Sequence, residues 1–163
     1  LRYATCARNC GDLTTTWQTA AVTASAGLSA SPSIAVDSAG TLHLTYQGLL
    51  DTDLRYATCE ANCLLGPSQW TDIDLLNFGD VGGGTSLQAD RRGRLHLAYA
   101  DREGFALGYA TCASGCDAAN RWRSLRVDTR TDIPSAPQLL LGRDGRIRVA
   151  YLADLRQAVR YLE

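Results

Sequence analysis

Short runs of alternating hydrophobic and polar residues follow one another along the chain, and turn-forming residues separate them. Residues 41–46 place apolar side chains at every second position after the turn at 38–40, and 94–99 and 146–151 repeat this arrangement. Alternation with a period of two is typical of β-strands that bury one face. No stretch has a helical period of useful length. The pattern therefore predicts an all-β chain of short strands joined by tight turns.

A six-residue segment ending in Tyr-Ala-Thr-Cys returns at a nearly constant interval. Leu-Arg-Tyr-Ala-Thr-Cys stands at 1–6 and 54–59, Leu-Gly-Tyr-Ala-Thr-Cys stands at 107–112, and Val-Arg-Tyr at 159–161 begins a further copy. Self-similarity of this kind predicts repeated supersecondary units that bury their apolar faces against one another. The chain then forms one segment, 1–163, divided into repeats 1–53, 54–106 and 107–158 and a partial fourth repeat, 159–163.

Each repeat contains four predicted strands, A to D in chain order with A innermost. Strands A and B form a hairpin whose first copy turns between Asp37 and Gly40. An aspartate can accept backbone hydrogen bonds there, and a glycine can adopt the positive φ that the turn requires. Strand C carries the repeated tyrosine, and strand D follows a tryptophan. Four antiparallel strands per unit are typical of β-propeller blades, so we expect about three blades per chain.

Two segments resemble a known repeat family. Pro-Ser-Ile-Ala-Val-Asp-Ser-Ala-Gly-Thr-Leu-His-Leu-Thr-Tyr at 32–46 and Asp-Leu-Arg-Tyr-Ala-Thr-Cys at 53–59 are similar to the BNR-like, sialidase-type β-propeller repeats of bacterial exported proteins. The resemblance covers essentially the whole chain and implies blade architecture. It implies no particular activity, because this fold carries lectins, hydrolases, adhesins and passive scaffolds.

The chain departs from the sialidase pattern where catalysis would need it. The Asp-box, Ser-x-Asp-x-Gly-x-Thr-Trp, is not present in proper form, since Leu42 and His43 stand where Thr-Trp would follow. A sialidase also needs an arginine cluster, a Tyr and Glu nucleophile pair and an acidic Asp. The tyrosines recur in every unit, as packing residues do, and glutamate occurs only at Glu60, Glu103 and Glu163. We expect no enzyme and no catalytic residues; a degenerate glycosidase is the weakest alternative.

All six cysteines fall into one repeated pattern with three residues between the members of each pair. This spacing, in segments rich in Asn, Gly and Ser, suits a local disulfide that stabilises by about 2 kcal/mol. Free thiols and a metal site are the alternatives, but zinc requires four ligands in one place. Local disulfides imply an oxidising compartment, so we expect an extracytoplasmic or secreted protein. The predicted pairs are Cys6 with Cys10, Cys59 with Cys63, and Cys112 with Cys116.

One tryptophan precedes strand D in each repeat: Trp17, Trp70 and Trp122. A repeated aromatic residue could stack on sugars, which would give a carbohydrate-binding propeller with one pocket per blade. The structural interpretation is a clamping role, in which each indole packs the outer strand against its sheet. A scaffold or recognition module without catalysis is therefore our first expectation, and a lectin-like propeller that binds glycans is the alternative; a protein ligand is also conceivable.

Charge and the remaining polar candidates narrow the partners. The chain has 16 Lys plus Arg and 17 Asp plus Glu, for a formal net charge of −1, so no basic field favours nucleic acid. No apolar run reaches the roughly 20 residues of a membrane span. His43 and His96 occupy equivalent strand B positions and are expected to hydrogen-bond locally. Calcium at Asp51 and Asp53 is disfavoured because further carboxylates are lacking in the sequence nearby. We expect no metal and no cofactor.

The strand count raises the question of closure. The chain has three A, three B, four C and three D strands, which cannot close a ring alone. Propellers typically have four to eight blades, because fewer would require too sharp an angle between neighbouring sheets. We expect head-to-tail assembly, in which strands A and B of one chain meet strands C and D of the next. A homodimer would give six blades and a homotrimer nine. The final Leu162 and Glu163 break the repeat, as a cloning scar in an engineered fragment or a native end would.

Overall fold

The fold is all-β, as the alternation predicts. The computed structural model describes residues 1–24, 29–129, 134–153 and 158–163. The strands are β1 (Arg2–Thr5), β2 (Gln18–Ala21), β3 (Ser29–Val36), β4 (Leu42–Gly48), β5 (Leu54–Cys59), β6 (Thr71–Leu76), β7 (Val81–Ala89), β8 (Leu95–Asp101), β9 (Ala106–Cys112), β10 (Arg123–Asp128), β11 (Pro134–Leu141), β12 (Ile147–Ala153) and β13 (Ala158–Leu162). Three short 3₁₀ helices, η1 (Cys63–Leu65), η2 (Pro67–Gln69) and η3 (Ala119–Arg121), lie in the connections before β6 and β10.

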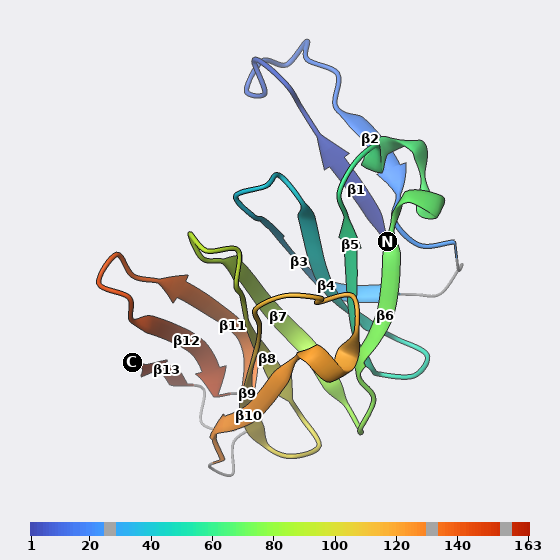
Figure 1. Cartoon of the computed structure of the whole chain (residues 1–163). Helices are drawn as coiled ribbons and strands as arrows, with labels where there is room; N and C mark the ends of the chain where they lie inside the picture. The colour runs from blue at the N-terminus through green and yellow to red at the C-terminus, as the bar shows by residue number, and fades with distance from the viewer. Residues whose placement is uncertain (25–28, 130–133, 154–157) are drawn as a thin grey trace.

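The strands form four antiparallel sheets. Two sheets have four strands, in the orders β3-β4-β5-β6 and β7-β8-β9-β10; β11-β12-β13 has three strands and β1-β2 has two. Figure 1 shows the sheets following one another in chain order, with β1-β2 at one end of the array and β11-β12-β13 at the other. The sheets are offset from the sequence repeats. Each repeat supplies the last two strands of one sheet and the first two of the next, so adjacent repeats are tied together by backbone pairing.

The A–B turns have the chemistry that the sequence predicts. Asp37 Oδ1 accepts the backbone N–H groups of Ala39 and Thr41, each at 2.9 Å, and Gly40 has φ +88°. The equivalent turn places a carboxylate of Asp90 against two backbone N–H groups, at 2.8 and 2.9 Å. A side chain with a β-carbon is disfavoured at positive φ, so the glycine and the aspartate together fix the hairpin.

The first strand of each large sheet begins several residues earlier than the alternation predicts. The pairing register shifts inside all three strands: between Ala30 and Ser33 in β3, and at the equivalent places in β7 and β11. Ser31 and Ala136 have φ +52° and +45°, and each directly precedes a proline. A β-bulge with an extra residue interrupts the period of two. The alternation therefore predicts only the part of each strand that follows the bulge.

Hydrophobic side chains pack between consecutive sheets, so each contact between sheets has its own core. Between the two four-stranded sheets the fully buried residues include Leu54, Tyr56, Leu95, Leu97 and Tyr99. A second cluster lies between β1-β2 and the sheet of β3 to β6, and a third between the sheets that contain β8 and β12. This layered core is what stacking of repeated units requires.

Candidate functional site

The three cysteine pairs lie at disulfide-bonding distance, as predicted. Their Cα atoms are 5.7 Å apart for Cys6 and Cys10, 5.9 Å for Cys59 and Cys63, and 5.8 Å for Cys112 and Cys116. These separations lie within the range of ordinary disulfides. Each bridge closes the loop between the repeated tyrosine strand and the following tryptophan.

Two of the three tryptophans are buried. Trp70 is 7% exposed and Trp122 is 8% exposed. Their indole N–H groups donate to the backbone carbonyls of Cys63 at 3.2 Å and Cys116 at 2.9 Å, inside the disulfide loops. A buried ring has no free face for a sugar, so this geometry favours the clamping role at these two positions. Trp17 differs, since it is 51% exposed.

The two histidines take part in equivalent hydrogen bonds, one buried and one partly buried. His43 Nδ1 lies 2.7 Å from the Tyr56 hydroxyl, and His96 Nδ1 lies 2.6 Å from the Tyr109 hydroxyl. Burial raises the pKa of Tyr56 to about 12, so at neutral pH the phenol keeps its proton and can donate it to the ring nitrogen. The histidines therefore bond locally, within their own sheet, as the sequence interpretation expected.

An aspartate faces the other ring nitrogen of each histidine. His43 Nε2 lies 3.4 Å from Asp37 Oδ2 and His96 Nε2 lies 3.5 Å from the equivalent carboxylate. Burial lowers the pKa of His43 and outweighs the attraction of Asp37, which acts to raise it. The same balance lowers the pKa of His96. The arrangement holds neutral histidines against the turn aspartates.

A polar groove opens between the two four-stranded sheets, at the end that carries the A–B turns and the disulfide loops. Its volume is about 790 Å³. Polar side chains on its walls include those of Asp37, His43, Thr58, Gln69, Arg92 and Asp117. This mixture of donors and acceptors suits a hydroxyl-rich ligand better than an apolar one.

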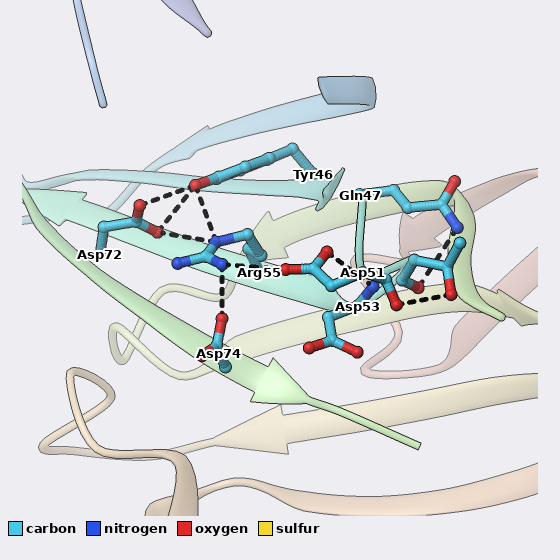
Figure 2. Close-up of polar contacts among 8 residues, drawn as sticks. Tyr46, Gln47, Asp51, Asp53, Arg55, Asp72 and Asp74 are labelled. Carbon is cyan, nitrogen blue, oxygen red and sulfur yellow. Dashed lines mark hydrogen bonds and ion pairs between the residues drawn. The ribbon is translucent and has the colours of Figure 1, made fainter. Parts of the chain in front are cut away.

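A charged cluster lies at the opposite end of the same sheet, around Arg55 on β5. The guanidinium group lies 2.6 Å from a carboxylate oxygen of Asp74, 3.5 Å from one of Asp51 and 3.6 Å from one of Asp72 (Figure 2). The Tyr46 hydroxyl donates to Asp72 at 2.8 Å and accepts from Arg55 Nε at 3.2 Å. One arginine on β5 thus contacts side chains from β4, β6 and the loop before β5.

Three carboxylates of this cluster are close enough to share a cation. One oxygen from each of Asp51, Asp53 and Asp74 lies within 4.8 Å of the others. Burial, then the charges of Asp51 and Asp74, raise the pKa of Asp53. Arg55 pairs with two of the three, Asp51 and Asp74, and also with Asp72, so one guanidinium offsets only part of the negative charge of the cluster. The sequence drew attention to Asp51 and Asp53 and missed Asp74, which strand pairing brings close from β6.

The residues named for a glycosidase do not converge in the polar groove. Glu60 lies on its rim, whereas Glu163 lies at the exposed end of β13. Glu163 accepts from the Tyr161 hydroxyl at 3.1 Å and pairs with Arg146 and Arg148. Asp144 also pairs with Arg148, so two carboxylates and two arginines neutralise one another at an open surface. The geometry favours a role in holding β13 against β12.

The comparisons with known proteins add no assignment: no family model matches the chain, and no curated protein is similar to it. Within the described residues, no helix has the length and apolar character needed to cross a membrane.

Proposed function

We propose that this chain is a non-catalytic β-propeller segment of about three blades, which acts as a scaffold or recognition module. Copies join head-to-tail, two or three at a time, into a larger ring outside the cytoplasm. The stacked antiparallel sheets and the three local disulfides support this proposal. The observation that carries it is the exposure of matching apolar faces at the two ends of the array.

Equivalent positions on the first strand of each large sheet differ sharply in exposure. Leu87 on β7 is 3% exposed and Leu139 on β11 is 4% exposed, because the preceding sheet covers each of them. Ile34, the equivalent residue on β3, is 50% exposed, and Val36 beside it is 56% exposed. An apolar face that two internal copies bury is therefore open on the third.

The opposite end of the array shows the complementary gap. Ala100 on β8 is fully buried under the next sheet, whereas the equivalent Leu152 on β12 is 44% exposed. The internal contacts show what covers such a face, namely the first strand of a following sheet. A second copy presents that strand as β3, so the β12 face and the β3 face fit as neighbouring blades do.

A repeated hydrogen bond accompanies these contacts. Ser33 Oγ accepts the backbone N–H of Leu87, and Ser86 Oγ accepts that of Leu139, both at 2.9 Å. Gln138 stands at the equivalent position on β11 and is exposed. Its side-chain oxygen can accept the Ile34 N–H of a second copy, which continues the series.

Light scattering at micromolar concentration tests the assembly. We expect two or three times the mass of one chain. The variant Ile34→Arg places a charge in the proposed contact and should be monomeric, while Leu50→Arg makes the same kind of change at a leucine that is 83% exposed in the β4–β5 loop and should stay assembled. A monomeric parent protein would refute the ring.

The polar groove favours carbohydrate binding as a second candidate function. Its hydrogen-bonding walls lie between two blades, so the lectin alternative now has a site other than the tryptophans. A glycan array tests it. This candidate would be supported if the protein binds a glycan and Arg92→Ala abolishes that binding without a change in thermal stability. If the protein binds no glycan, the carbohydrate-binding function is rejected and the scaffold role stands.

A further inference from the structure

Edge-to-face contacts between a tyrosine and a tryptophan join each sheet to the next. The rings of Tyr3 and Trp70 are 5.9 Å apart between centroids at 60°, and those of Tyr56 and Trp122 are 5.2 Å apart at 66°. In both pairs the tyrosine lies on a strand C, which is β1 for Tyr3 and β5 for Tyr56. The tryptophan directly precedes the fourth strand of the following sheet. This contact explains why Trp70 and Trp122 are buried.

The series stops at both ends of the array. Tyr109 occupies the tyrosine position on β9 and is only partly buried, whereas Tyr56 is 1% exposed. Trp17 occupies the tryptophan position before β2 and is 51% exposed. Within the described residues, neither ring has the Tyr–Trp contact that its counterparts make. Tyr161 on β13, the last copy of the repeated tyrosine, has no such contact among the described residues either. Trp17 and Tyr109 are thus one tryptophan and one tyrosine that could form the next pair of the series.

The sheets at the two ends of the array also have fewer than four strands. β1 and β2 form the third and fourth strands of a blade position, and among the described strands β1 pairs only with β2. β11, β12 and β13 form a sheet with no described strand beyond β13. Val159 and Tyr161 on β13 are 74% and 58% exposed. β1-β2 therefore carries the strand that this sheet lacks.

The registers agree with a replacement of β13 by β1. In the complete sheet Thr45 lies opposite Tyr56, and in the last sheet Ala150 lies opposite Tyr161. Residues 1–6 repeat the sequence of 54–59, so β1 beside β12 sets Tyr3 opposite Ala150. β13 competes for this edge without bringing a fourth strand.

We propose that β1 and β2 of one copy take the place of β13 beside β12 of a second copy, so that Trp17 of the first copy packs on Tyr109 of the second. The inference rests on the head-to-tail assembly proposed above and names the segments that form its joint. In the joined sheet β11, β12, β1 and β2 give the order of a complete blade, and the Tyr–Trp series continues from copy to copy.

A photo-crosslinking experiment tests the contact directly. Unlabelled protein with benzoylphenylalanine in place of Trp17 is co-refolded with uniformly ¹⁵N-labelled parent protein and irradiated. Mass spectrometry should find the probe joined to a labelled peptide that contains Tyr109, which proves that the two ends come from different copies. The same probe at Leu13, a fully exposed neighbour in the β1–β2 loop, is the matched control and should give no such adduct.

Two variants test the exchange by their effect on the mass. Trp17→Ala should weaken association by about thirtyfold or more, as loss of a central interface tryptophan does. Deleting 159–163 should leave the oligomer intact, and it should tighten association about tenfold if β13 occupies the edge nine-tenths of the time.

The outcomes separate this inference from the ring itself. An oligomer without the Tyr109 adduct, or one that dissociates when 159–163 are deleted, overturns the strand replacement while the assembly stands. A parent protein that is monomeric overturns both. An adduct confined to one copy's own residues likewise refutes the exchange.

Discussion

Replacing Trp122 with alanine should destabilise the folded chain by about 3–5 kcal/mol. The indole is 8% exposed, so the change leaves a cavity between the two four-stranded sheets. Part of the cost is the edge-to-face contact with Tyr56, which contributes about 1 kcal/mol beyond burial. A further part is the hydrogen bond to the Cys116 carbonyl, since an unpaired buried acceptor costs about 1–3 kcal/mol.

Urea unfolding followed by far-UV circular dichroism measures this cost. The measurement belongs in the Ile34→Arg background, where association does not add to the stability. Trp122→Phe keeps an aromatic ring but loses the N–H donor and part of the buried volume, so we expect an intermediate cost of about 1–3 kcal/mol. Leu125→Ala, at a leucine that is 53% exposed on β10, should change the stability by less than about 0.5 kcal/mol. If Trp122→Ala costs no more than Leu125→Ala, the indole does not hold the sheets together and the clamping role is wrong.

Three further changes test other parts of the structure. Stability should fall as the pH drops below about 6.5, because burial lowers the pKa of His43 and His96 in the folded chain and the unfolded chain therefore binds protons at a higher pH. In the variant with both histidines changed to glutamine, the melting temperature should vary less between about pH 7 and 5. Replacing the Cys112 disulfide with two serines should cost about 2 kcal/mol in urea unfolding, and a reductant should then destabilise this variant less than the parent protein, because only the other two disulfides remain to be reduced. Gly108→Ala should cost about 1–3 kcal/mol, since its β-carbon would lie 2.2 Å from a tyrosine ring, whereas Gly11→Ala, in open space, should be close to neutral by thermal unfolding.

The features that sequence alone predicts are those with local chemistry. The A–B turns follow from Asp37 and Gly40. Asp37 bonds to backbone groups no more than four residues away, and Gly40 supplies the positive φ within the same turn. The cysteine pairs follow from a spacing of four residues, and the strand type follows from alternation. Each of these needs only neighbours along the chain, so one sequence suffices.

The features that sequence missed depend on strand pairing or on bulges. Asp74 joins Arg55 only because β6 lies beside β5 in a particular register. The early start of β3 was hidden by Ser31 and the proline after it, which interrupt the alternation. A signal was available in both cases. Ser-Pro at 31–32 and Ala-Pro at 136–137 stand at equivalent places in the repeats, where the register shifts, and Asp74 alternates with Asp72 on one predicted strand.

The hexapeptide Leu-Arg-Tyr-Ala-Thr-Cys occurs twice, at 1–6 and 54–59, and separates local sequence from environment. In β5 Leu54 and Ala57 are fully buried, whereas in the copy at 1–6 Leu1 is half-buried and Ala4 is exposed. The residues are identical, so the difference comes from neighbours: β5 has β4 along one edge, and β1 pairs only with β2 among the described strands. Burying an exposed aliphatic side chain contributes up to about 1.5–3 kcal/mol, and an open strand edge leaves backbone groups to water. The six residues that are buried in the middle of the array are thus more exposed at its end, and the proposed assembly rests on this difference.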